Sequence, residues 1–129
     1  MIVRSNVNWR NKTILIVEDD WANYLYLKEV VSELGAKMLY ARNGVEAVEF
    51  CKKEEEINMI LMDIKMPEMN GYEATMQIKK IKPNLPIIAQ SAYALQNEIY
   101  KYNDVFDGYI TKPINIDTLK EELEKHFVI

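Results

Sequence analysis

Cysteine and histidine are nearly absent from this chain of 129 residues, which contains one of each. A single cysteine, Cys51, excludes a disulfide within the chain. Its place among apolar residues of a predicted helix favours a small buried hydrophobe over a reactive thiol. His126 lies on the last predicted helix, and nothing around it in the sequence suggests a catalytic role.

Long apolar runs and an excess of positive charge are also missing. The apolar segments Ile14–Val17 and Met59–Met62 are far shorter than the roughly 20 residues of a membrane-spanning helix, and the N-terminus lacks a signal-peptide pattern. The formal net charge of -4 gives no electrostatic footprint for nucleic acid or for an anionic membrane. We therefore expect a cytoplasmic domain that binds neither, or the soluble part of a larger, membrane-anchored protein.

The composition is that of one globular domain, with 49% hydrophobic and 28% charged residues. Residues 1–12 are mostly polar and are interpreted as an N-terminal tail or linker remnant. Residues 13–129 are long enough to bury a core of their own, and we assign the domain to them.

From Ile14 onward, short apolar segments alternate with segments of helical period. The predicted strands are Ile14–Val17, Lys37–Tyr40, Met59–Met62, Pro86–Gln90 and Asp107–Ile110. The predicted helices carry Tyr24 to Leu34, Asn43 to about Lys53, about Tyr72 to Ile81, then Leu95, Ile99 and Tyr102, and finally Ile116 to Phe127. This alternation predicts a parallel sheet with helices on both faces and a functional crevice at the carboxyl ends of the strands.

Polar side chains follow the predicted strands at the points where that crevice should lie. Glu18, Asp19 and Asp20 follow the first strand, and Asp63 follows the third. Ser91 follows the fourth strand, and Lys112 comes shortly after the fifth. Asp19 and Asp20 are also candidates for the N-cap of the first helix. We expect most of these side chains to converge at one edge of the sheet.

The residue types predict Mg²⁺-dependent phosphoryl chemistry at this edge. Neighbouring carboxylates repel one another, and a hard divalent cation with a preference for oxygen ligands relieves that repulsion. Glu18, Asp19 and Asp63 would supply the ligands, and one of them can attack a phosphoryl donor to form an acyl phosphate. The ammonium of Lys112 and the hydroxyl of Ser91 would then neutralise and bind the phosphoryl oxygens.

The amino-acid sequence of these segments resembles that of a known family. The segments are Glu18-Asp19, Met62-Asp63 followed by Met66-Pro67-Glu68-Met69-Asn70-Gly71, Pro86 to Ala92, and Tyr109-Ile110-Thr111-Lys112-Pro113. In this order and spacing they are similar to the signature blocks of two-component response-regulator receiver domains, most of all those attached to hybrid sensor histidine kinases. The resemblance covers roughly residues 12 to 127. It implies a flavodoxin-like, doubly wound α/β fold, with a five-stranded parallel sheet in the order 2-1-3-4-5 and five helices.

The resemblance also implies roles for the site residues. Asp63 would be the phospho-acceptor. Asp19 would be the main metal-binding carboxylate, Glu18 would act largely through a metal-bound water, and the backbone carbonyl of Lys65 would complete the protein ligands. Lys112 would bind the phosphoryl group.

Further expected roles concern switching and lifetime. Ser91 and Tyr109 would form the switch pair. Tyr109 taken alone is better explained as a half-buried strand aromatic, and only its place three residues before Lys112 favours the switch role. The peptide bond before Pro113 would be cis. Lys65 and Tyr93 occupy positions that tune phosphoryl lifetime in this family.

The implied partner is a sensor histidine kinase or a histidine phosphotransfer protein, and a phosphorylation-linked dimer is compatible with the family. No stand-alone enzyme is implied beyond self-phosphorylation from a donor and slow autodephosphorylation.

Three other functions are alternatives to a phosphoryl-accepting receiver. A Mg²⁺-dependent phosphotransferase with an Asp nucleophile would need a second carboxylate where Lys65 stands. A flavin-binding module would not place Glu18-Asp19-Asp20 in its phosphate loop. A pseudo-receiver that only binds proteins stays open.

Overall fold

A parallel five-stranded sheet forms the centre of the molecule, as predicted. The computed structural model describes residues 8–53, 56–64, 69–92 and 105–126. The strands β1 (Thr13–Val17), β2 (Lys37–Ala41), β3 (Met59–Asp63), β4 (Ile87–Ala92) and β5 (Gly108–Lys112) are arranged in the order β2-β1-β3-β4-β5. All neighbouring strands are parallel. The strand order confirms the flavodoxin-like topology.

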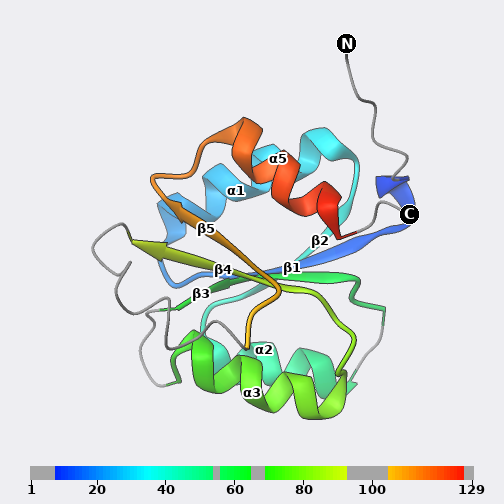
Figure 1. Ribbon diagram of the computed structural model, residues 1–129, viewed down its shortest axis with the longest axis vertical. Coiled ribbons are helices and arrows are strands. Elements are labelled where there is room, and N and C mark those ends of the chain that lie inside the picture. Colours follow the sequence, from blue (N-terminus) through cyan, green and yellow to red (C-terminus); the bar gives the residue numbers. More distant parts are fainter. Residues whose placement is uncertain (1–7, 54–55, 65–68, 93–104, 127–129) are drawn as a thin grey trace.

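Helices cover both faces of this sheet. The helices α1 (Trp21–Leu34) and α5 (Ile116–Lys125) lie on one face, and α2 (Gly44–Lys53) and α3 (Gly71–Ile81) lie on the other (Figure 1). The described residues contain these four α-helices and one short 3-10 helix, η1 (Trp9–Asn11). The fifth expected helix, marked by Leu95, Ile99 and Tyr102, falls outside the described residues, and so does Phe127.

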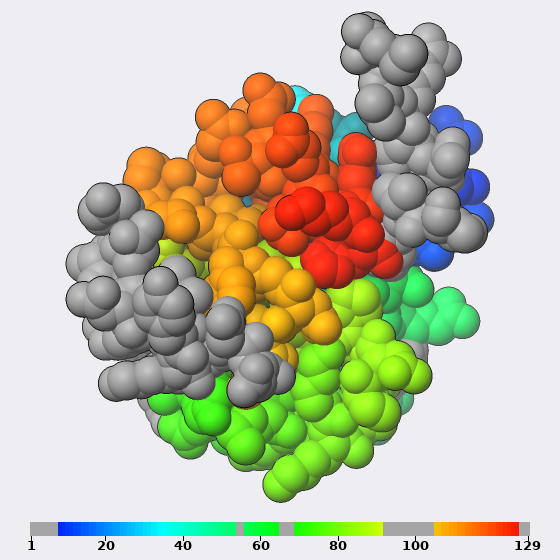
Figure 2. Space-filling model, viewed as in Figure 1, coloured from blue at the N-terminus to red at the C-terminus, as the bar shows by residue number. Residues whose placement is uncertain are grey.

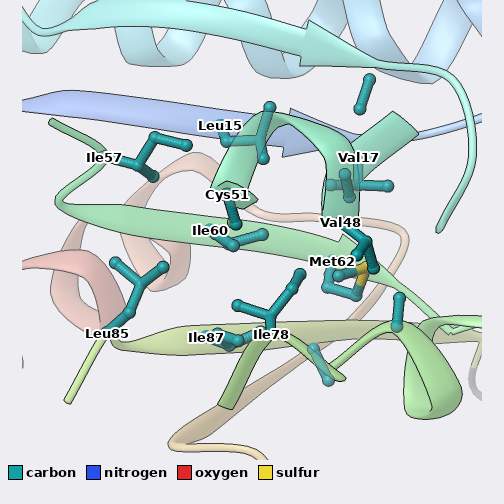
Figure 3. Packing of buried hydrophobic residues seen from close by; sticks show 14 of the residues in the cluster. Leu15, Val17, Val48, Cys51, Ile57, Ile60, Met62, Ile78, Leu85 and Ile87 are labelled. Carbon is teal, nitrogen blue, oxygen red and sulfur yellow. The ribbon is translucent and has the colours of Figure 1, made fainter. Parts of the chain in front are cut away.

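The two faces of the sheet bury separate apolar clusters because successive strand residues point to opposite sides. Leu15, Ile60 and Ile87 contribute to the cluster beneath α2 and α3, which also takes in Cys51 (Figure 3). Ile14, Leu61 and Ile88, with residues of α1 and α5, form the other cluster. A buried Cys51 agrees with its interpretation as a core hydrophobe, and this burial raises the pKa of its thiol.

Side-chain caps fix where the helices begin. The carboxylate of Asp20 accepts the amide hydrogens of Ala22 (2.9 Å) and Asn23 (3.4 Å), so Asp20 is the N-cap of α1. Asn70 caps α3 in the same way by accepting the N–H of Glu73 at 2.9 Å. The choice that the sequence left between Asp19 and Asp20 is thereby decided in favour of Asp20.

The strands β4 and β5 each continue two residues further than predicted. The strand β4 was expected to end at Gln90 and β5 at Ile110, but the parallel ladder also pairs Ser91 with Thr111 and Ala92 with Lys112. Backbone hydrogen bonding does not require apolar side chains, so the ladder extends past the last apolar residue of each strand. Ser91 and Lys112 therefore lie on strands rather than on the loops that follow them.

Trp9 lies in the core, although it belongs to the segment 1–12 that we interpreted as a tail. Its side chain is 6% exposed and packs in the cluster beneath α1 and α5. The N–H of Lys12 donates to the carbonyl oxygen of Trp9 at 3.0 Å, and the N–H of Lys37 donates to the carbonyl oxygen of Lys12 at 2.9 Å. The η1 turn thus continues the path of β1 and closes the apolar core at this end of the sheet.

This burial gives a prediction for the two tryptophans of the chain. Trp9→Ala should lower the free energy of unfolding by about 3 kcal/mol, because a large buried ring is lost and a cavity remains. Trp21→Ala is the matched control: Trp21 is 58% exposed, and we expect a loss of about 1 kcal/mol or less. Chemical denaturation measures both values, and equal losses would contradict the burial of Trp9.

Candidate functional site

Two carboxylates and one ammonium meet at the carboxyl edge of the sheet. Asp63 is the last residue of β3, Glu18 directly follows β1, and Lys112 is the last residue of β5. Parallel strands end at the same edge, so residues far apart in the sequence converge there. Glu18 is fully buried and Asp63 is 4% exposed, which is unusual for charged side chains and marks the site as more than a surface cluster.

Asp19 completes an acidic cluster with these two residues. One carboxylate oxygen from each of Glu18, Asp19 and Asp63 lies within 4.8 Å of the others. Asp19 is exposed and is not the helix N-cap, a role that belongs to Asp20. The cluster therefore opens to solvent on the side of Asp19 and is closed on the side of the sheet.

Lys112 is shared between the two buried carboxylates. Its Nζ lies 3.3 Å from Oδ1 of Asp63, to which it donates a hydrogen bond, and 3.6 Å from Oε2 of Glu18. The Lys112 side chain is 29% exposed, so the ammonium stands between the buried carboxylates and solvent. Among the described residues, one positive charge thus faces three carboxylates, which leaves an excess of negative charge in this part of the site.

The environment of Asp63 favours its protonated form. Burial, reinforced by the nearby carboxylate of Glu18, raises the pKa of Asp63 from 3.8 to about 7, while Lys112 acts in the opposite direction. A second positive charge near Asp63 would restore the ionised carboxylate at neutral pH. The site thus combines a carboxylate that is costly to ionise with an opening through which a cation can reach it.

The donor set fits a hard divalent cation. Carboxylate oxygens are the ligands that Mg²⁺ prefers, and it usually binds one or two of them together with waters and phosphate oxygens. Glu18, Asp19 and Asp63 provide oxygens from two chain segments at suitable mutual distances. Lys65 and Tyr93, which the sequence also placed at the site, lie outside the described residues.

Ser91 and Tyr109 lie on the neighbouring strands β4 and β5. Ser91 is 2% exposed, and its Oγ has no hydrogen-bond partner among the described residues. The half-buried ring of Tyr109 meets Phe106 edge to face, with ring centroids 5.8 Å apart. The structure therefore offers a buried hydroxyl at the end of β4. The switching motion expected of this pair stays a prediction.

The segment after β5 has the expected backbone form. The peptide bond between Lys112 and Pro113 is cis. The phenol of Tyr26 on α1 donates to the carbonyl oxygen of Ile114 at 2.8 Å, which ties this segment to α1. Lys112 is thus carried by a strand end whose continuation is attached to the neighbouring helix.

Sequence reasoning missed two amides at this site. Nδ2 of Asn23 on α1 donates to Oε2 of Glu18 at 2.8 Å and lies 3.5 Å from Oε1 of Gln90 on β4. Gln90 is fully buried and pairs in register with Asp63. An amide in an otherwise apolar strand segment was the only available signal for Gln90. Asn23 had none, because asparagine is common near helix starts.

Comparison with known proteins assigns this chain to a family. The family model of the response regulator receiver domain matches residues 14–124. The chain belongs to the response regulator receiver family, the receiver domains of two-component signalling systems.

Relatives of two kinds share this domain. The autoinducer 1 sensor kinase/phosphatase LuxN of Vibrio campbellii is 35% identical over 117 residues, which covers 91% of this chain but 14% of LuxN. The sporulation initiation phosphotransferase F of Bacillus subtilis is 31% identical over 119 residues, and the match covers 90% of this chain and 94% of that protein. The domain therefore occurs both within large sensor kinases and as a protein of about this length.

A solved structure of similar fold holds a metal ion. The receiver domain of sensor histidine kinase PA1611 from Pseudomonas aeruginosa PAO1 matches with a TM-score of 0.81 and 29% identity, over 88% of this chain and 95% of that one. It has a magnesium ion coordinated in its active site cleft. In the described part of the present chain, no helix combines the length and apolar character that a membrane crossing requires.

Proposed function

We propose that the domain accepts a phosphoryl group on Asp63 from a phosphohistidine of a sensor histidine kinase or histidine phosphotransfer protein, with Mg²⁺ bound at the acidic cluster. The observation that carries this proposal is the buried carboxylate of Asp63 at the end of β3, held between Lys112 and the carboxylates of Glu18 and Asp19. Membership of the receiver family supports it.

In the proposed reaction an oxygen of Asp63 forms a bond to phosphorus while the bond from phosphorus to the donor imidazole nitrogen breaks. The released imidazole keeps the electron pair of the broken bond and can take up a proton. Asp63 must be ionised to attack, and Lys112 at 3.3 Å favours that form. After transfer the same ammonium can bind a phosphoryl oxygen, and Ser91 can donate a hydrogen bond to another.

The bound cation would be held by Glu18, Asp19, Asp63 and the backbone carbonyl of Lys65. It would supply neutralisation of the charge on the phosphoryl oxygens. Slow attack of water on the acyl phosphate would return the domain to its first state, with Lys65 and Tyr93 setting the lifetime. The domain would act in the cytoplasm, free-standing or as part of a hybrid kinase.

The acyl phosphate would change the outer surface of the domain through Ser91 and Tyr109. The phosphoryl group would add negative charge and three acceptor oxygens at the end of β3. Ser91 lies on the neighbouring strand β4, and its Oγ has no hydrogen-bond partner in the part of the chain that the structure describes. Movement of this hydroxyl would leave space behind it for the Tyr109 ring. The edge strand β5, which Figure 2 shows at the surface between α5 and α3, would then present an altered face to a partner or a second copy of the domain.

Phosphoryl uptake tests this proposal directly. The protein is incubated with acetyl phosphate or phosphoramidate and Mg²⁺, and its intact mass is measured. The wild type should gain one phosphoryl group, Asp63→Asn should gain none, and the matched control Asp117→Asn on the exposed start of α5 should behave like the wild type. A folded wild type of unchanged mass would instead favour the pseudo-receiver, and a modified Asp63→Asn would place the acceptor elsewhere.

A further inference from the structure

Glu18 is a buried carboxylate that depends on a small number of donors. Its side chain is fully buried, and ionised groups in such surroundings are stable only when hydrogen bonds and opposite charges compensate for the lost water. The N–H of Asp20 approaches Oε1 at 3.3 Å, Nζ of Lys112 lies 3.6 Å from Oε2, and Nδ2 of Asn23 donates to Oε2 at 2.8 Å. The shortest of these contacts is the one from Asn23.

Gln90 accepts a second hydrogen bond from the side-chain amide of Asn23. Nδ2 of Asn23 carries two hydrogens. One is directed to Glu18, and Oε1 of Gln90 lies at 3.5 Å as acceptor for the second. Gln90 belongs to the β4 face that otherwise packs Ile88 against the apolar cluster beneath α1 and α5. A buried amide is costly without hydrogen bonds. Among the described residues, the contact from Asn23 to Oε1 is the hydrogen bond that the Gln90 side chain makes, and its Nε2 has no partner.

We propose that Asn23 and Gln90 form an amide bracket that positions the carboxylate of Glu18 for a divalent cation. Asn23 orients Glu18, and Gln90 orients Asn23. Both are positioning residues, because Asn23 acts through Glu18 and Gln90 acts through Asn23. The inference rests on the cation site of the proposed function and adds two residues, from α1 and β4, that set the affinity of that site.

The bracket also keeps the ammonium of Lys112 close to Asp63. Oε2 of Glu18 receives both Asn23 and Lys112, at 2.8 and 3.6 Å. Without the amide, Lys112 would be the remaining side-chain donor to this oxygen among the described residues, and it would be drawn towards Glu18 and away from Asp63. With the amide in place, Oε2 is satisfied and Lys112 keeps its hydrogen bond to Asp63 at 3.3 Å.

Titration with Mg²⁺ alone, followed by amide chemical shifts in two-dimensional NMR, measures this effect. Asn23→Leu removes both donors with little change of volume, and the dissociation constant for Mg²⁺ should rise about tenfold, as is typical for loss of a residue that orients a metal ligand. Gln90→Met keeps the chain length, and we expect a rise of about threefold because Asn23 remains but is less fixed. Gln77→Met on the exposed face of α3 is the matched control and should leave the constant unchanged.

The double variant separates a bracket from two independent effects. Because Gln90 acts through Asn23, adding Gln90→Met to Asn23→Leu should weaken Mg²⁺ binding no further. Multiplying effects, or an unchanged affinity in Asn23→Leu, would overturn the bracket. The same spectra report whether each variant is folded. If Asn23→Leu is unfolded, the dissociation constants for Mg²⁺ of Gln90→Met and Gln77→Met are compared instead, and equal constants would overturn the bracket.

This experiment also distinguishes the bracket from the proposed function. A wild type that binds Mg²⁺ but gains no phosphoryl group would overturn phosphoryl acceptance while the titrations still test the bracket. Phosphoryl uptake with an affinity that does not depend on Asn23 and Gln90 would overturn the bracket alone. A wild type that binds no Mg²⁺ would overturn both.

Discussion

Asp63→Asn should make the metal-free protein more stable at neutral and alkaline pH than the wild type. Ionisation of Asp63 in the folded state is opposed by burial and by Glu18, which raise its pKa to about 7. Asparagine has the same shape, carries no charge, and can donate to Glu18 and accept from Lys112. The shift from 3.8 to about 7 sets a ceiling of about 4 kcal/mol. We expect a gain of about 2 to 4 kcal/mol in the free energy of unfolding, measured by denaturation in the presence of a chelator.

The gain should depend on pH in a defined direction. The folded-state pKa of Asp63 lies above the unfolded-state value, so between about pH 4 and 7 the folded wild type binds more protons than the unfolded chain. The contribution of Asp63 to wild-type stability therefore falls as the pH rises through this window. The advantage of Asp63→Asn should be small near pH 4, grow up to about pH 7 and remain constant above it.

Two controls accompany this measurement. Asp117→Asn removes an exposed carboxylate from the first turn of α5, and we expect a change of less than about 0.5 kcal/mol at every pH. Mg²⁺ should stabilise the wild type by binding to the folded state and should narrow its difference from Asp63→Asn. An advantage that is equal at pH 4 and pH 8 would show that the charge of Asp63 is not its cause.

The sequence predicted the site well where one rule of parallel sheets applied. Strand order and the convergence of Glu18, Asp19, Asp63 and Lys112 follow from apolar runs that end in polar residues at a common edge. Strand ends were less predictable, since Ser91 and Lys112 are held by backbone ladders that do not depend on side-chain polarity. The convergence of these four residues was therefore predicted, whereas Ser91 and Lys112 were expected on loops and lie on strands. The functional roles of the site residues stay predictions.

Features that depend on contacts across the fold could not be read from the sequence. Trp9 belongs to a 3-10 helix of three residues, which is too short to show a hydrophobic period in the sequence. Its burial becomes evident only from its packing in the apolar cluster beneath α1 and α5. Asn23 and Gln90 are far apart in sequence, and no motif pairs them. Their proposed role follows only from the distances of Asn23 to Glu18 and to Gln90. Such contacts are set by tertiary packing, which single-sequence patterns do not encode.

The second large effect is expected for Gly71→Ala, at the start of α3. A methyl group on Gly71 would collide with the backbone oxygen of Asp63, would lie 2.9 Å from Cα of Ile64 and would also crowd Met62. Two of these neighbours are backbone atoms, which cannot move aside as a flexible side chain does. We expect a loss of about 3 kcal/mol in the free energy of unfolding, at the upper end for overpacking. Denaturation of the variant measures it.

Gly35→Ala is the matched control for Gly71→Ala. Gly35 ends α1 with a positive φ of 90°, and a Cβ there would meet only Cγ of Arg10, at 3.9 Å. Its cost is backbone strain of about 1 kcal/mol. Gly35 is remote from the acidic cluster in the sequence and lies at the opposite end of α1 from Asp20. Phosphoryl uptake by Gly35→Ala should therefore equal that of the wild type.

Gly71→Ala should affect the site as well as stability, because α3 begins against the acceptor strand. The N–H of Gly71 donates to the carbonyl oxygen of Ile64 at 2.8 Å, which fixes the start of the helix directly behind Asp63. To accommodate a methyl group, either α3 or the end of β3 must shift, and a shift of β3 moves Asp63 relative to Lys112. Phosphoryl uptake should then be slowed at temperatures where the variant is fully folded. If Gly71→Ala lowers the free energy of unfolding no more than Gly35→Ala does, the close approach of α3 to Asp63 does not constrain the site. If the free energy of unfolding falls but phosphoryl uptake is unchanged, α3 is the element that shifts and β3 keeps its position.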